Sequence, residues 1–118
     1  MFLRNRWYVG ALSREVGREP RQSWMLGQPV VLFQKRNGDA VAMSDRCPHR
    51  HAPLSLGSLL GDEIQCRYHG MQFDCSGACT LVPGEASIPA AMRVAIFRVV
   101  HWFWKTRNWK PTPWLMQR

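Results

Sequence analysis

Short apolar runs separated by turn-forming residues make up most of this chain. The runs Trp7–Ala11, Ser23–Leu26 and Val30–Gln34 each have the length of one β-strand. Asn37-Gly38-Asp39 then predicts a tight hairpin, with Ala40–Ser44 as the returning strand. Short strands broken by frequent turns predict an all-β fold, either a small antiparallel sandwich or a barrel.

The second half of the chain continues this pattern with shorter segments. Leu59–Glu63 is rich in turn-forming residues and predicts a turn, after which Ile64–Gln65 forms a short strand. Met71–Phe73 and Ala78–Leu81 flank Asp74–Gly77, which predicts another hairpin. Every predicted strand is short. The polar stretch Leu12–Glu19 suits either one helical turn or a loop.

Two loops between these strands carry metal-ligand residues. Cys47 and His49 lie in the first, Cys66 and His69 in the second, and sixteen residues separate the two motifs. Four such ligands suit one tetrahedral zinc ion, or a [2Fe–2S] cluster with thiolates on one iron and imidazoles on the other. The cluster is favoured because each loop mixes one cysteine with one histidine. Gly70 directly follows the second motif and suits a tight turn beside a metal centre.

The residues around the motifs carry a family resemblance over about residues 2 to 100. Cys47–Gly57 and Cys66–Gly70 closely resemble the two cluster loops of the Rieske non-haem iron oxygenases, in particular the vanillate O-demethylase and toluenesulfonate monooxygenase types. Asn5–Val9 is similar to the entry strand of that family, and Phe73–Gly84 looks like its next hairpin and proline loop. The resemblance implies a Rieske-type antiparallel fold over residues 1–100, with a cluster-binding subdomain of two loops.

The resemblance also implies the ligand set. It assigns Cys47, His49, Cys66 and His69 to a [2Fe–2S] cluster. On chemistry alone His51 is a rival to His49, and only the family pattern Cys-x-His selects His49. His51 is then expected to be a loop residue near the cluster.

Three arginines flank the expected ligands, namely Arg46, Arg50 and Arg67. Two interpretations stay open. Arginines that point inward would favour the reduced, more negative cluster, whereas arginines at loop edges would be ordinary surface residues. The loops contain no additional cysteines, so the chain resembles the oxygenase and ferredoxin branch of Rieske proteins, which lacks the bracing disulfide of the respiratory type. The resemblance implies a reduction potential at the low end of the Rieske range.

Composition sets further limits. The chain has 118 residues, which suits one small domain. It contains no apolar run of about 20 residues and no apolar stretch typical of a signal peptide, so we expect a cytoplasmic protein without a membrane partner. Cys75 and Cys79 are then expected to be free thiols near a hairpin.

The C-terminal segment differs in composition from the rest. Residues 1–92 carry ten basic and eight acidic side chains, whereas residues 93–118 carry six basic and none acidic. The second segment also contains four of the six tryptophans. Nothing earlier in the chain supports binding to nucleic acid or a membrane. We therefore interpret residues 101–118 as an atypical basic, Trp-rich tail that departs from the family sequence, through an altered reading frame or gene end.

The expected function is one-electron transfer. Of the four histidines only His101 lies outside the cluster loops, so the chain cannot supply the two histidines of a mononuclear iron site. No glycine-rich dinucleotide fingerprint is present either. The resemblance implies a flavin- or ferredoxin-type reductase as electron donor and a mononuclear-iron catalytic domain or subunit as acceptor. A free-standing Rieske ferredoxin, a zinc-stabilised interaction module and a non-functional fragment stay open as alternatives.

Overall fold

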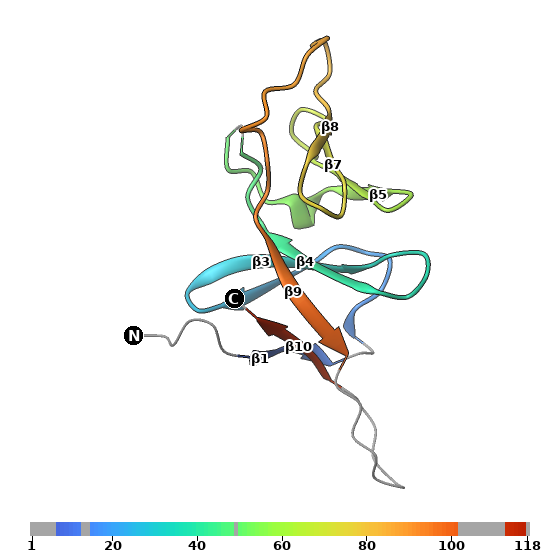
Figure 1. The fold of residues 1–118 in the computed structure, drawn as a ribbon, viewed down its shortest axis with the longest axis vertical. Helices are drawn as coiled ribbons and strands as arrows, with labels where there is room; N and C mark the ends of the chain where they lie inside the picture. The colour runs from blue at the N-terminus through green and yellow to red at the C-terminus, as the bar shows by residue number, and fades with distance from the viewer. Residues whose placement is uncertain (1–6, 13–14, 49, 102–112, 118) are drawn as a thin grey trace, which may run out of the picture.

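The larger of two antiparallel sheets forms the base of the molecule (Figure 1). The structure is a computed structural model that describes residues 7–12, 15–48, 50–101 and 113–117. Six strands form this sheet, in the order β1 (Trp7–Leu12), β10 (Pro113–Gln117), β9 (Ile96–His101), β4 (Ala40–Ser44), β3 (Gln28–Gln34) and β2 (Arg21–Met25). All neighbouring strands run antiparallel.

The smaller sheet is an insertion in the larger one. It consists of β5 (Ser58–Leu60), β6 (Glu63–Gln65), β7 (Gln72–Phe73) and β8 (Cys79–Leu81). The chain forms this sheet after β4 and then returns as β9, which pairs directly with β4. A short 3-10 helix, η2 (Leu54–Leu56), precedes it, and the described residues contain no helix long and apolar enough to cross a membrane.

The expected all-β class is confirmed, with differences at individual elements. The hairpin at Asn37–Asp39 forms as predicted, and it joins β3 to β4 with Gln34 opposite Ala40. The prediction of a turn over Leu59–Glu63 is wrong at both ends. Leu59 and Leu60 belong to β5 and Glu63 begins β6, so the turn is confined to Gly61 and Asp62. Strand β10 was not predicted.

The core lies on both faces of β3. Val31 and Phe33 point to one face and pack with Phe73 of the smaller sheet, whereas Val30 and Leu32 belong to a second cluster on the other face. Successive strand residues point to opposite faces, so a strand that is covered on both faces becomes a continuous apolar run. The first of these clusters also contains both cysteines of the expected metal site.

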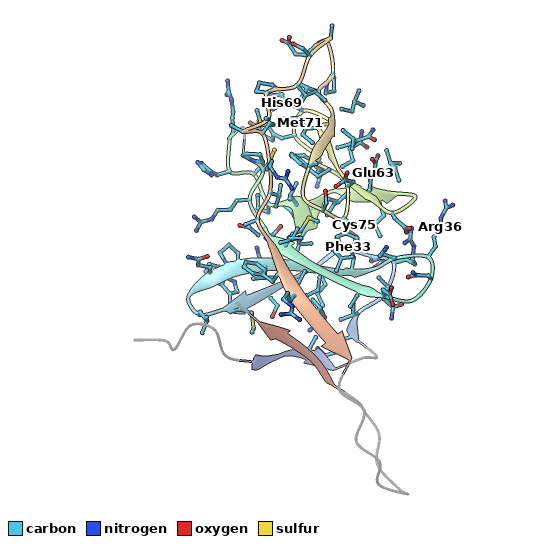
Figure 2. All side chains as sticks on the ribbon, in the orientation of Figure 1. Phe33, Arg36, Glu63, His69, Met71 and Cys75 are labelled. Carbon is cyan, nitrogen blue, oxygen red and sulfur yellow. The ribbon has the colours of Figure 1, made fainter. Side chains whose placement is uncertain are left out.

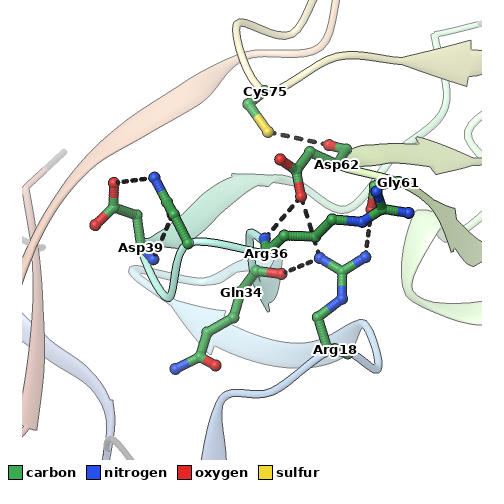
Figure 3. A network of polar contacts seen from close by, with 8 residues as sticks. Arg18, Gln34, Arg36, Asp39, Gly61, Asp62 and Cys75 are labelled. Carbon is green, nitrogen blue, oxygen red and sulfur yellow. Dashed lines mark hydrogen bonds and ion pairs between the residues drawn. The ribbon is translucent and has the colours of Figure 1, made fainter.

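A polar network fixes the β5–β6 turn to the larger sheet (Figure 3). The guanidinium of Arg18 donates to the backbone oxygens of Gln34 and Gly61 and forms an ion pair of 3.2 Å with Asp62. The backbone N–H of Arg36 donates to the same Asp62 oxygen at 2.8 Å. This backbone hydrogen bond is the main reason why the pKa of Asp62 is lowered. The turn that begins β6 is thus held in place, and β6 leads directly to Cys66.

Candidate metal centre

The first candidate loop is a tight turn that follows β4. The backbone N–H of Cys47 donates to the carbonyl of Ala52 at 2.8 Å, and the N–H of His51 donates to the carbonyl of Cys47 at 2.7 Å. His51 has a φ of +59°, in the left-handed region that few side chains adopt. The loop therefore closes on itself within six residues.

The second loop, between β6 and β7, repeats this geometry. The N–H of Cys66 donates to the carbonyl of Met71 at 2.7 Å, and the N–H of Gly70 donates to the carbonyl of Cys66 at 3.0 Å. Gly70 has a φ of +75°, which confirms the expected tight turn at this glycine. In both loops a cysteine begins the turn and the residue four positions later reverses the chain.

This correspondence separates the two candidate histidines of the first loop. His51 occupies the position that Gly70 occupies in the second loop, where the backbone needs a positive φ. Its side chain is exposed, as expected for a loop residue. The rival residue, His49, lies outside the described residues. His51 therefore has a structural role in the turn, whichever residue binds a metal.

The two loops bring their sulfur atoms into one buried region. Cys47 is 3% exposed and Cys66 is 2% exposed, and both belong to the same apolar cluster. Cys47 Sγ lies 3.9 Å from Met71 Sδ, so the first cysteine contacts the far end of the second loop. The sulfur-bearing side of the site is thus closed to water by apolar side chains.

His69 lies at the surface, unlike the cysteines. It is exposed, and its ring packs edge-on against Tyr68 at a centroid distance of 4.9 Å. Figure 2 shows His69 and Met71 at the end of the smaller sheet that is remote from the larger one. Among the described residues no three His, Cys, Asp or Glu side chains are grouped as the ligands of a single ion. The fourth expected ligand, His49, is not among those residues.

The flanking arginines are surface residues. Arg46, Arg50 and Arg67 are all exposed, so the interpretation in which they point inward is wrong. Arg50 and Arg67 instead border a groove of about 540 Å³ on the outside of the two loops. Its apolar part includes Leu56 and Tyr68, which are 61% and 68% exposed.

A buried carboxylate at the base of the first loop was missed in the sequence analysis. Asp45 is 1% exposed and accepts hydrogen bonds from Gln22 of β2 and from Ser55 of η2. It lies two residues before Cys47, so it fixes the start of the loop to the helix that follows the loop. Its position two residues before Cys47 is the only sign in the sequence that this aspartate belongs to the site, and the sequence does not show that it is buried.

The other two cysteines are not part of the paired loops, although both pack against the apolar cluster that contains Cys47 and Cys66. Cys75 Sγ donates to the backbone oxygen of Asp62 at 3.0 Å, and Cys79 Sγ donates to that of Leu81 at 3.5 Å (Figure 3 shows the first). Burial raises the pKa of both thiols. A raised pKa disfavours the thiolate form that binds metals.

Comparisons with known proteins agree on one family. The profile of the Rieske [2Fe–2S] domain matches residues 6–98. The putative toluene-4-sulfonate monooxygenase system iron–sulfur subunit TsaM2 of Comamonas testosteroni is 45% identical over 109 residues, which are 88% of this chain and 32% of that protein. The vanillate O-demethylase oxygenase subunit of Pseudomonas sp. (strain HR199 / DSM 7063) is 35% identical over 85 residues, which are 72% of this chain and 24% of that protein.

A solved structure extends the similarity to three dimensions. Apo dicamba monooxygenase matches this fold with a TM-score of 0.84 at 37% identity. The match covers 98% of this chain and 34% of that one. The chain therefore spans about a third of the length of such relatives.

Proposed function

Because this chain belongs to the Rieske [2Fe–2S] domain family, we propose that it transfers single electrons within an oxygenase system. The resemblance that the two loops predicted is confirmed, and the domain of this family binds a [2Fe–2S] cluster. When bound, such a cluster supplies a reversible one-electron couple. The relatives at this level of identity are oxygenase components, which favours an oxygenase system over a free-standing ferredoxin.

In this proposal Cys47, His49, Cys66 and His69 would hold the cluster, with the thiolates as ligands of one iron and the imidazoles as ligands of the other. The described residues fit this group in two respects. Two buried thiols come from two loops of the same geometry, and each loop contributes one soft sulfur ligand and one imidazole. Because His49 is not described, its role depends on the motif alone.

The different exposure of the ligands supports transfer of electrons at the surface. The sulfur side is packed against apolar side chains that exclude water, whereas His69 reaches the surface beside the groove at Tyr68. A partner protein can approach this imidazole closely without entering the core. The arrangement protects the sulfurs and leaves a short path between the site and a docked partner.

The partners follow from the relatives. We propose a flavin- or ferredoxin-type reductase as the electron donor and a mononuclear-iron catalytic domain or subunit as the acceptor. We assign any activity on a substrate to the acceptor, because this chain spans only about a third of the length of its relatives. We also propose residues 1–100 as the electron-transfer domain and residues 101–118 as a segment of different origin, whose strand β10 completes the larger sheet between β1 and β9.

The matched pair of cysteine loops is the observation on which this proposal rests. The test is an anaerobic dithionite titration of the purified chain, followed by visible absorption. We expect bleaching that is complete after one electron per chain and reversed by a mild oxidant. His69→Cys should change the spectrum, whereas His51→Ala should leave its shape unchanged. A colourless parent protein that contains zinc, or equal spectra for the parent and His69→Cys, would contradict the assignment.

A further inference from the structure

Asp45 is the one buried polar or charged side chain among the residues whose side chains the structure describes. It lies between the end of β4 and Cys47, with only Arg46 between the two. Because the chain extends by at most about 3.6 Å per residue, the Cα atoms of Asp45 and Cys47 are no more than about 7 Å apart. A buried carboxylate so close to a metal-binding cysteine calls for an explanation.

The carboxylate receives three hydrogen bonds. Ser55 donates its backbone N–H to Oδ1 at 2.6 Å and its hydroxyl to Oδ2 at 2.5 Å, and Gln22 donates its amide to Oδ2 at 2.8 Å. Both oxygens thus accept a hydrogen bond from an N–H group, and Oδ2 accepts a further one from the Ser55 hydroxyl. The ion pairs among the described residues join Arg18 to Asp62 and Arg21 to Glu15, so no described cation pairs with Asp45.

These contacts give Asp45 a mechanical role. Asp45 and Ser55 stand at the two ends of the first loop, and their hydrogen bonds tie those ends together. Gln22 connects the same carboxylate to β2 of the larger sheet. The loop that carries Cys47 is thereby fixed to both the helix η2 and the base of the molecule.

We propose that Asp45 is a positioning residue whose negative charge also lowers the reduction potential of the cluster held by Cys47. The inference rests on the proposed function, because it requires a cluster at this site. Reduction adds an electron, and a nearby negative charge disfavours that step. Salt screens this interaction poorly because the carboxylate is buried and within one Debye length of the cysteine.

An electrostatic role and a purely structural role predict different patterns of change in the reduction potential of the variants. Replacing the carboxylate by a neutral amide removes the negative charge and should raise the potential. Removing the side-chain hydrogen-bond donor of Ser55 or Gln22 keeps the negative charge of Asp45 but neutralises it less. This change should lower the reduction potential of the cluster. Loosening of the loop alone would move all such variants in the same direction.

The test is a dye-mediated redox titration of the anaerobically purified, cluster-containing protein, followed by visible absorption. We expect a higher midpoint potential for Asp45→Asn and a lower one for both Ser55→Ala and Gln22→Ala. Glu19→Gln removes an exposed carboxylate from the connection between β1 and β2 and should leave the potential unchanged.

The outcomes distinguish this inference from the proposed function. A parent protein without a redox-active cluster overturns the proposed function. A parent with a cluster, together with an unchanged or lower potential in Asp45→Asn, overturns the inference alone. If Asp45→Asn does not retain a cluster, the inference is tested by Ser55→Ala and Gln22→Ala. An unchanged or raised midpoint potential in those two variants overturns it.

Discussion

Gly57→Ala should disturb the metal centre from outside it. Gly57 follows η2, and a Cβ atom built on it would lie 1.8 Å from the backbone oxygen of Gln65. The same atom would lie 3.1 Å from the backbone oxygen of Leu54. Both neighbours are backbone atoms, so no side-chain rotation relieves the clash. Gln65 directly precedes Cys66, and the second loop must therefore shift when β6 moves.

The magnitude follows from this geometry. Overpacking a tight site costs roughly 1–3 kcal/mol, and a clash with backbone belongs at the upper end. At about 4 °C per kcal/mol for a domain of this size, a cost of about 3 kcal/mol lowers the melting temperature by about 12 °C. We also expect a lower iron and sulfide content, because the loop that carries Cys66 is displaced.

Two other glycines provide controls. Gly17→Ala meets nothing within 4 Å and should leave the melting temperature unchanged or slightly raised. Gly84→Ala also meets nothing within 4 Å, but Gly84 has a φ of +84°, so this variant measures backbone strain of about 1–2 kcal/mol without a clash. Thermal melts followed by circular dichroism, with iron analysis of the same samples, compare the three variants. If Gly57→Ala has the same melting temperature as Gly17→Ala and keeps its iron, the predicted clash with the Gln65 backbone is wrong.

Three further predictions concern the core, the spare thiols and the polar network. Phe73→Ala should lower the free energy of unfolding by about 3–5 kcal/mol, since its ring is fully buried between the sheets, and a loss below 1 kcal/mol in denaturant unfolding would argue against this packing. Cys75→Ser and Cys79→Ser should retain the parent's iron and sulfide content, and loss of iron from either would mean that the ligand assignment is incomplete. Asp62→Asn should melt below the parent at pH 7, because the Arg36 N–H holds the pKa of Asp62 below 3.8 and the stability from this group is present above that pH. The difference in melting temperature between Asp62→Asn and the parent should shrink as the pH falls below 3.8. An equal difference at pH 7 and at pH 3 would contradict this prediction.

Local patterns predicted the elements that depend on local chemistry. The hairpin at Asn37–Asp39 and the strand Ala40–Ser44 form where the turn residues and the apolar run place them. The two cysteine loops could also be found from sequence, because ligand type and spacing are themselves the chemical signal. Each of these features is contained within about ten residues.

Features that depend on distant partners could not be predicted. β10 (Pro113–Gln117) lies between β1 and β9, where Trp7 pairs with Gln117 at the other end of the chain. Its apolar run, Trp114–Met116, is short and follows a basic, Trp-rich segment, so only its pairing with β1 and β9 identifies it as a strand. Whether residues 101–118 are family sequence stays a prediction.

The surroundings of the site show the same limit. Asp45 reads as an ordinary polar residue, and only the folded chain brings Gln22 and Ser55 to its oxygens. His51 can bind a metal as well as His49 can. Only the structure shows that His51, like Gly70 in the second loop, has a positive φ and reverses the chain. Charge alone could not place the flanking arginines, because their orientation depends on how the two loops pack.

The most direct test of the central claim is the content of iron, acid-labile sulfide and zinc in anaerobically purified protein. We expect two irons and two sulfides per chain, with little zinc. In Cys66→Ser we expect iron and sulfide to be lost together. One zinc per chain without sulfide would contradict the assignment of Cys47, Cys66 and His69 to a cluster.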